Sequence, residues 1–143
     1  MTTIAYRNGT IAGDTLVSGG GIHDCSAIKV ARNERGDLAG ASGTAHYCHH
    51  FLEWFRGGER NPAPDVPEDN EAFIVRAADP NLIECWEEPG RFVVSAPYYA
   101  VGSGKRLALG AMAFGATADQ AVNCAAKHCV QTGGDVTVLY HAG

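Results

Sequence analysis

The stretch TTIAYRNGTIAGDTLV, residues 2–17, decides the fold because it predicts two short strands joined by a tight turn. The first strand covers residues 2–7 and ends at Asn8-Gly9, a dipeptide that strongly favours a two-residue hairpin. The second covers residues 10–17, after which Ser18 and three consecutive glycines break the pattern. The chain is therefore predicted to open on an antiparallel hairpin.

Two further strands and a helix are predicted after this hairpin. The strands cover residues 27–32 and 37–41, and four short strands in series favour an antiparallel sheet. From Thr44 apolar residues recur at helical spacing until Gly57-Gly58, which predicts a helix. The segment NPAPDVPEDN, residues 61–70, predicts an exposed loop because it contains three prolines.

Both strands and helices are predicted in the second half of the chain. Strands are predicted over the ranges 72–77, 82–87, 91–96 and 136–140, and helices over 103–114 and from Thr117 to Gly133-Gly134. Thr117-Ala118-Asp119-Gln120 is a capping-box pattern, which marks a helix start. Strands covered by helices from separate places favour a layered α+β fold, and the length predicts a single domain over residues 1–143.

Composition restricts the class of protein. The net charge of −5 gives no basic footprint for nucleic acid. The five cysteines are odd in number and show no CxxC spacing, so we expect reduced thiols in a cytoplasmic protein. The first residues do not resemble a secretory signal, and no run approaches about 18 apolar residues. Neither secretion by that route nor a membrane span is predicted.

Two apparent ligand-binding motifs have a better interpretation or fail on sequence. His46, His49 and His50 stand at helical spacing, but no acidic ligand accompanies them, and an exposed polar helix face is the better interpretation. Gly104-Lys105 invites a phosphate-loop interpretation, which fails because Tyr99 stands where the first glycine of that motif belongs. No cofactor-binding residues are predicted.

Five segments resemble one family in the same order. They are Thr2-Thr3-Ile4, Ile11-Ala12-Gly13-Asp14, Ile28-Lys29-Val30, Ser42-Gly43-Thr44-Ala45 and Ala100-Val101-Gly102-Ser103-Gly104. They are similar to the TTI, AGD, KKV, GGTA and GSG segments of HslV and proteasome β subunits, and the resemblance spans nearly the whole chain. It implies an Ntn-hydrolase fold, a four-layer αββα sandwich with two antiparallel sheets between helix layers.

The resemblance implies that Thr2 is the nucleophile of a threonine endopeptidase, after removal of Met1. A threonine hydroxyl needs an adjacent base, and an N-terminal amine is one known solution. The amine titrates near about 7.7 to 8.0, so it accepts the hydroxyl proton at neutral pH. The small side chain of Thr2 favours removal of Met1 in the cytosol.

The resemblance also implies roles for five further residues. Lys29 would lower the pKa of the nucleophile through its charge, and Asp14 would hold Lys29 in place. The Ser42-Gly43 turn would aim a backbone N–H at the oxyanion, and Ser103 would contact the amine of the nucleophile. Without the family, each has an ordinary alternative, such as a solvated strand lysine or a local hydrogen-bonding aspartate.

Partners and ions follow from the family alone. The resemblance implies a ring-shaped homo-oligomer, a polypeptide substrate and an ATP-dependent unfoldase, and it requires no cofactor. It allows a structural Na⁺ bound through backbone carbonyls of Ala126, Cys129 and Thr132.

The chain also departs from the family. The second helix of the family has no counterpart, because the loop at 61–70 takes its place, and Ser42 replaces a glycine. Two other functions therefore stay open. One is a catalytically silent proteasome-like subunit with an assembly or binding role, and the other is an Ntn amidase acting on a small molecule.

Overall fold

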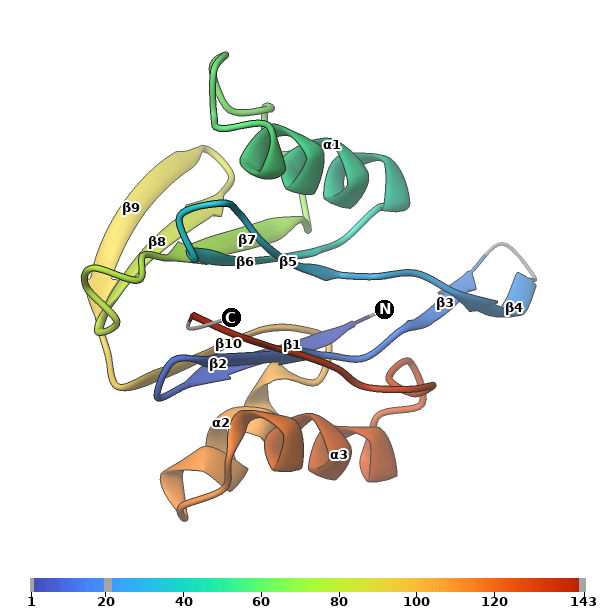
Figure 1. Ribbon diagram of the computed structural model, residues 1–143. Helices are drawn as coiled ribbons and strands as arrows, with labels where there is room; N and C mark the ends of the chain where they lie inside the picture. Colours follow the sequence, from blue (N-terminus) through green and yellow to red (C-terminus); the bar gives the residue numbers. More distant parts are fainter. Residues whose placement is uncertain (1, 20–21, 142–143) are drawn as a thin grey trace.

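The computed structural model describes residues 2–19 and 22–141 and has four layers (Figure 1). A five-stranded sheet of order β5-β6-β7-β8-β9 lies over a four-stranded sheet of order β10-β1-β2-β11. One helix covers the first sheet and two cover the second (Figure 1). The strands are β1 (Thr3–Arg7), β2 (Thr10–Gly13), β3 (Leu16–Gly19), β4 (Ile22–Ser26), β5 (Val30–Arg32), β6 (Leu38–Ser42), β7 (Glu71–Val75), β8 (Leu82–Glu87), β9 (Gly90–Ser95), β10 (Tyr98–Gly102) and β11 (Thr137–Tyr140); the helices are α1 (Ala45–Arg56), α2 (Lys105–Ala113) and α3 (Ala118–His128).

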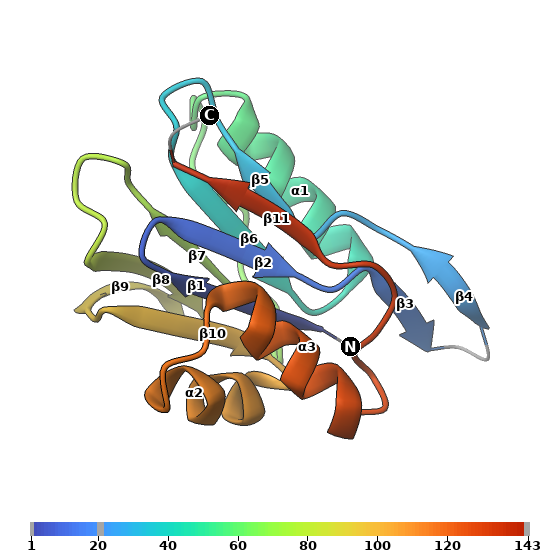
Figure 2. The ribbon, with the colours of Figure 1, turned by 60° about the horizontal axis from the view of Figure 1, so that its bottom comes forward.

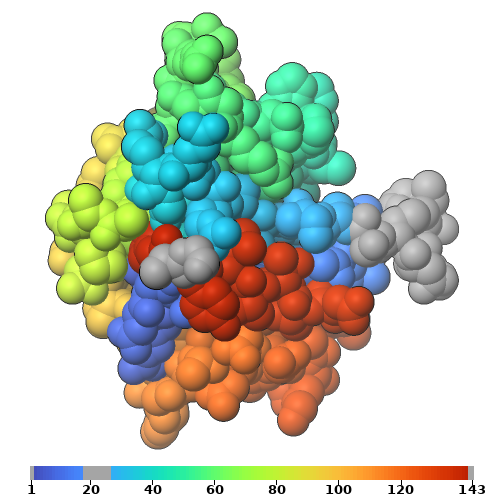
Figure 3. Space-filling model, viewed as in Figure 1, coloured from blue at the N-terminus to red at the C-terminus, as the bar shows by residue number. Residues whose placement is uncertain are grey.

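The strands within both large sheets pair antiparallel. β1 lies between β10 and β2, with Thr3 opposite Gly102 and Ile4 opposite Gly13. β11 pairs with β2 at the sheet edge, so the last strand of the chain lies beside the hairpin that β2 forms with β1 (Figure 2). At the surface, β11 also lies beside β5 of the other sheet (Figure 3).

Each pair of neighbouring layers buries its own apolar cluster. Ile4, Tyr6, Ile11, Leu38 and Phe73 fill the space between the two sheets and are fully buried. A second cluster joins α1 to the five-stranded sheet, and a third, rich in alanine, joins α2 and α3 to the other sheet. Small residues in the third cluster allow the two helices to lie close to the strands.

The helix starts follow the local sequence. The side chain of Thr117 accepts a hydrogen bond from the N–H of Gln120, and the Gln120 side chain accepts one from the N–H of Thr117. This confirms the predicted capping box. Thr44 caps α1 in the same manner, accepting from the N–H of Tyr47 at 3.3 Å. Between α1 and β7 the chain forms no helix, because residues 61–70 form a loop, as the sequence predicts.

The predicted element order is wrong in two places, and the bounds of one helix differ slightly. The predicted strand over 10–17 ends at Gly13, and a separate two-stranded sheet, β3 and β4, follows beside the main body (Figure 1). β10, which pairs with β1, was not predicted at all. The helix predicted over 103–114 is shorter, since α2 covers only Lys105–Ala113.

Within the described residues, no helix is both long and apolar enough to cross a bilayer.

Candidate active site

A cleft of about 590 Å³ opens beside the start of β1. One wall is the face of α1, and the other is formed by the start of β3 and the residues that lead into β5. Thr2, Lys29 and Gly43 all line it, although they are far apart in the chain. The volume lies within the range of about 300 to 1,000 Å³ that is usual for ligand sites.

Thr2 lies at this cleft with only 4% of its surface exposed. Its backbone nitrogen donates to the hydroxyl of Ser103 at 3.2 Å. The same hydroxyl donates to the Thr2 carbonyl at 3.3 Å, and so does the N–H of Gly104, also at 3.3 Å. Gly102 has φ +100°, and a Cβ there would lie 2.1 Å from the Thr2 carbonyl oxygen, so only glycine fits this close approach. The loop after β10 therefore fixes the backbone of Thr2 from both sides.

Asp14 and Lys29 form a buried ion pair. The Lys29 Nζ donates to Asp14 Oδ1 at 3.1 Å and to the Leu16 carbonyl at 2.6 Å. Asp14 also accepts from the N–H groups of Thr3 at 3.0 Å and Gly133 at 3.1 Å. Burial lowers the pKa of Lys29, and attraction by Asp14 opposes that shift without cancelling it. Asp14 thus places an ammonium group at the cleft that also contains Thr2.

The turn between β6 and α1 presents a backbone donor. Gly43 has φ +136°, and within the described chain no group accepts a hydrogen bond from its N–H. Asn70 Oδ1 accepts from the Thr44 N–H at 2.7 Å and from the Thr44 hydroxyl at 3.3 Å. A Cβ on Gly43 would lie 2.0 Å from the same oxygen. Ser42 is buried and its hydroxyl lies near Gly102, so its side chain does not line the cleft.

We expect Asn70→Ala to lower kcat/KM by about tenfold to a hundredfold in any hydrolysis that uses the Gly43 N–H. The Thr44 N–H loses its buried acceptor and the turn loosens, which costs about 1–3 kcal/mol. Chemical denaturation and steady-state kinetics measure the two effects. Glu68→Ala changes a nearby exposed residue that contacts Asn70 only through its backbone carbonyl, and it should alter neither by more than about 0.5 kcal/mol. Equal kinetics in the Asn70 and Glu68 variants contradict this role.

The end of α3 meets the start of β1. The Thr3 and Thr132 hydroxyls share a buried hydrogen bond of 2.7 Å. Cys129 lies with its sulfur 3.5 Å from the Ser103 hydroxyl. Burial raises the pKa of the Cys129 thiol, but hydrogen bonds with Thr132 and Ser103 outweigh it and leave the pKa below its ordinary value.

The carbonyls suggested for a monovalent cation lie in this region. Ala126 belongs to the last turn of α3, while Cys129 and Thr132 follow it. The Cys129 carbonyl accepts a hydrogen bond from the Thr132 N–H at 3.1 Å, which uses one of its two lone pairs. Cation binding by these three residues stays a prediction.

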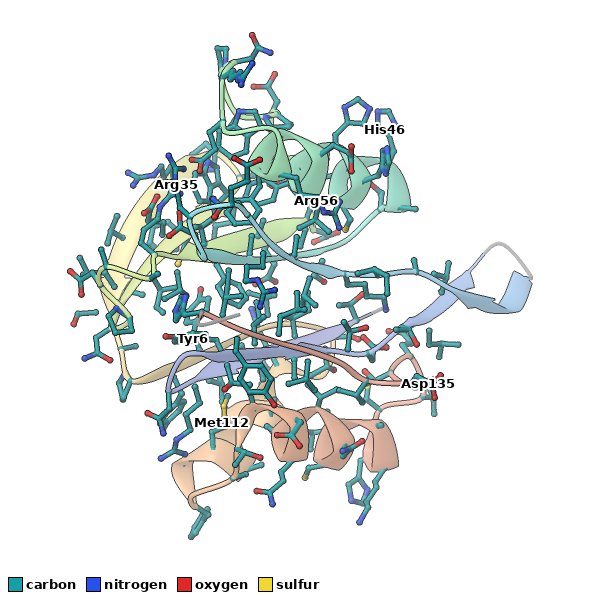
Figure 4. The ribbon with its side chains drawn as sticks, viewed as in Figure 1. Tyr6, Arg35, His46, Arg56, Met112 and Asp135 are labelled. Atoms are coloured by element: carbon teal, nitrogen blue, oxygen red, sulfur yellow. The ribbon has the colours of Figure 1, made fainter. Side chains whose placement is uncertain are left out.

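The three histidines of α1 are exposed, and His49 lines the cleft with Thr2. His46, labelled in Figure 4, and His50 do not line it. The ring centroids of His46 and His50 lie 4.3 Å apart. Across the described ranges, no three histidine, cysteine or acidic side chains gather in a way that could hold a metal ion.

No protein-family model and no curated protein matches the chain. Solved structures do match, and two of them come from one organism. Thiobacillus denitrificans BPH in complex with epoxomicin is 22% identical, with a TM-score of 0.67 and 99% of each chain covered. A second structure of Thiobacillus denitrificans BPH is 20% identical, with a TM-score of 0.63, and the match covers 99% of this chain and 98% of that one. The layers found here are those implied by the resemblance to HslV and proteasome β subunits. The chain has the Ntn-hydrolase fold.

This Ntn-hydrolase fold brings together most of the residues that the sequence singled out. Thr2, Lys29 and Gly43 line one cleft, Asp14 holds Lys29, and Ser103 contacts Thr2. Sequence reasoning missed Asn70 and Thr3. Their contacts join positions far apart in the chain, and no local pattern signals them. Met1 lies outside the described residues, so its removal stays a prediction.

Proposed function

We propose that this chain is a threonine peptidase of the HslV and proteasome β-subunit type, in which Thr2 becomes the N-terminal nucleophile after removal of Met1. One observation carries the proposal: Thr2 is buried, its nitrogen is fixed by Ser103, and it shares a cleft with the Lys29–Asp14 pair. A residue with no catalytic role needs no buried ammonium group in the cleft that it lines, since burying a charged group is costly.

The first step forms a tetrahedral intermediate on the Thr2 oxygen. The free amine of Thr2 takes the hydroxyl proton, and the hydroxyl oxygen attacks the carbonyl carbon of the peptide bond. The positive charge of Lys29 favours the ionised oxygen over the neutral hydroxyl. The Gly43 N–H donates to the oxyanion that forms, an interaction typically worth about 3 to 4 kcal/mol of barrier.

The second step releases the product. The ammonium of Thr2 gives its proton to the leaving amine, and the tetrahedral intermediate collapses to an acyl ester on the Thr2 oxygen. Water, deprotonated by the same amine, then hydrolyses the ester and restores the hydroxyl. Ser103 keeps the amine oriented through both steps by its hydrogen bond to the Thr2 nitrogen.

The wider setting rests on the resemblance. We infer a cytoplasmic homo-oligomeric ring that takes unfolded polypeptides, with an ATP-dependent unfoldase as partner and neither nucleic acid nor membrane among its partners. The family's second helix, which packs beside the first, has no counterpart next to α1, so the outer layer of this chain differs there. The docking of an unfoldase is therefore the part of this proposal that most needs an experiment.

The deciding experiment is the intact mass of the purified protein before and after incubation with epoxomicin. This epoxyketone reacts with both the hydroxyl and the amine of an N-terminal threonine. We expect a mass without methionine that then gains one inhibitor. A mass that retains Met1 and gains nothing supports the silent subunit instead. A mass that lacks Met1 and still gains nothing overturns the peptidase.

A further inference from the structure

We propose that His46 and His50 form a chelating pair for one late divalent transition-metal ion, for which Ni²⁺ and Cu²⁺ fit best. The pair lies on α1, and neither residue lines the cleft that contains Thr2. Binding there requires nothing of Thr2, so the proposal goes beyond the proposed function and stands apart from it.

The two histidines lie one turn apart on one face of α1. Residues four apart on a helix are neighbours, with their Cβ atoms about 5–6 Å apart. Two histidines at this spacing also hold the zinc ion on the HExxH helix of metalloproteases. Both side chains are exposed, and His46 points outward from the first turn of the helix (Figure 4). An ion can therefore reach both rings from solvent.

The separation of the two rings fits one shared ion. A metal–nitrogen bond of about 2.1 Å, with roughly 1.2 Å from the nitrogen to its ring centre, places each centroid about 3.3 Å from the ion. The centroids of His46 and His50 lie 4.3 Å apart. They would subtend roughly 80° at the ion, near the right angle of square-planar and octahedral sites and well short of the tetrahedral angle. This angle favours Cu²⁺ and Ni²⁺ over tetrahedral Zn²⁺.

His49 does not fit the same ion. Its ring centroid lies 6.1 Å from that of His50. With the same bond lengths, this separation would need an angle of roughly 135° at the ion, which suits neither square-planar nor octahedral coordination. His49 lines the cleft instead. Sequence spacing could not choose among the three histidines, because the distance between rings depends on side-chain conformation.

The chemistry of the ligands sets the class of ion. Imidazole suits copper, nickel and zinc, whereas Mg²⁺ and Ca²⁺ require oxygen ligands. Two imidazoles leave positions on the ion for water or for a ligand from another molecule. In the part of the chain that the structure describes, no third histidine, cysteine or acidic side chain completes a metal-binding group. We therefore expect an exchangeable ion and not a closed structural site.

The neighbouring charges do not supply the affinity. The positive end of the α1 dipole disfavours a cation near His46, although this effect is confined to the first turn. Glu53 lies almost one turn beyond His50, but Arg56 donates to it at 2.8 Å and compensates its charge. The affinity must therefore come from the two coordinate bonds, so the loss of either ring should remove most of it.

The test is calorimetric titration of the full chain with NiCl₂. Ni²⁺ is the probe because, unlike Cu²⁺, it does not oxidise the free thiols of this chain. We expect His46→Ala and His50→Ala each to lower the affinity of the tightest site at least about tenfold. Because the two rings act as one chelate, the double variant should lose far less than the product of the two single losses. The matched control is His49→Ala, which should bind Ni²⁺ as tightly as the unmodified chain.

Thermal unfolding gives an independent measurement. An ion that binds only the folded helix raises the midpoint of unfolding by an amount that grows with its concentration. This rise should appear in the unmodified chain and in His49→Ala and be lost in His46→Ala. Alanine is a good helix former, so each variant should fold without the ion.

Three outcomes overturn the site. The first is undiminished Ni²⁺ affinity in the double variant. The second is a pair of single losses that multiply in the double variant, which would show that the two rings bind separate ions. The third is a loss in His49→Ala as large as that in His50→Ala.

Discussion

Thr2→Ala is expected to fold normally and to lose at least about a thousandfold in kcat/KM, together with all reaction with epoxomicin. The variant lacks the attacking oxygen, and no remaining group can form the ester. The backbone hydrogen bonds that fix residue 2 come from its own nitrogen and carbonyl, so they survive the substitution. Peptide hydrolysis, intact mass and thermal unfolding measure the three expectations.

The matched control for this prediction is Thr2→Ser. It keeps a hydroxyl and an N-terminal amine and lacks only a methyl group, so we expect an inhibitor adduct and measurable hydrolysis. Activity in Thr2→Ala comparable to that of the unmodified chain would show that another residue is the nucleophile. Loss of folding in Thr2→Ala would show instead that Thr2 is structural.

Lys29→Met is expected to lower activity at least about a hundredfold and the free energy of unfolding by about 3 kcal/mol. Methionine keeps the length of the side chain but removes the charge beside the nucleophile. Asp14 then stays buried without its ionic partner, and breaking a buried pair in this way typically costs about 3 to 5 kcal/mol. The Thr3 and Gly133 N–H groups still bind Asp14, which places the loss at the lower end.

Arg32→Met is the control for Lys29→Met. Arg32 is an exposed cation in β5, a few residues further along, and among the described residues it donates to the Tyr140 carbonyl alone, at 3.1 Å. Its replacement should change stability by less than about 1 kcal/mol and leave the kinetics intact. Denaturant unfolding and steady-state kinetics of the two variants give the comparison. Similar small effects in both would remove Lys29 from the proposed mechanism.

The parts of this fold that the sequence predicts are those with a strong local signal. Asn8-Gly9 marks the β1–β2 hairpin and Thr117 marks the start of α3, because hairpin turns and helix caps need particular residues at fixed positions. The β3–β4 pair was not predicted because Ser18 and the glycines after it indicate the end of a strand and not a turn between two strands. β10 was not predicted because its strand character depends on pairing with β1.

The candidate site divides in a similar way. Thr2, Asp14 and Lys29 stand in segments that resemble known motifs, and the structure brings them to one place. Asn70 lies at the end of a proline-rich loop, and nothing near it in sequence suggests that it binds Thr44, 26 positions away. Such contacts depend on how the layers pack, so a local pattern cannot contain them.

The contacts that close this site join the two ends of the chain, with a consequence for the order of synthesis. Thr3 bonds to Thr132 across 129 positions, and Asp14 to Gly133 across 119. A ribosome delivers the N-terminal residues long before their C-terminal partners exist. The nascent polypeptide therefore cannot complete the environment of Thr2 until Thr132 and Gly133 have emerged. In the proposed peptidase, this order of assembly would delay activity until the C-terminal partners of Thr3 and Asp14 have been made.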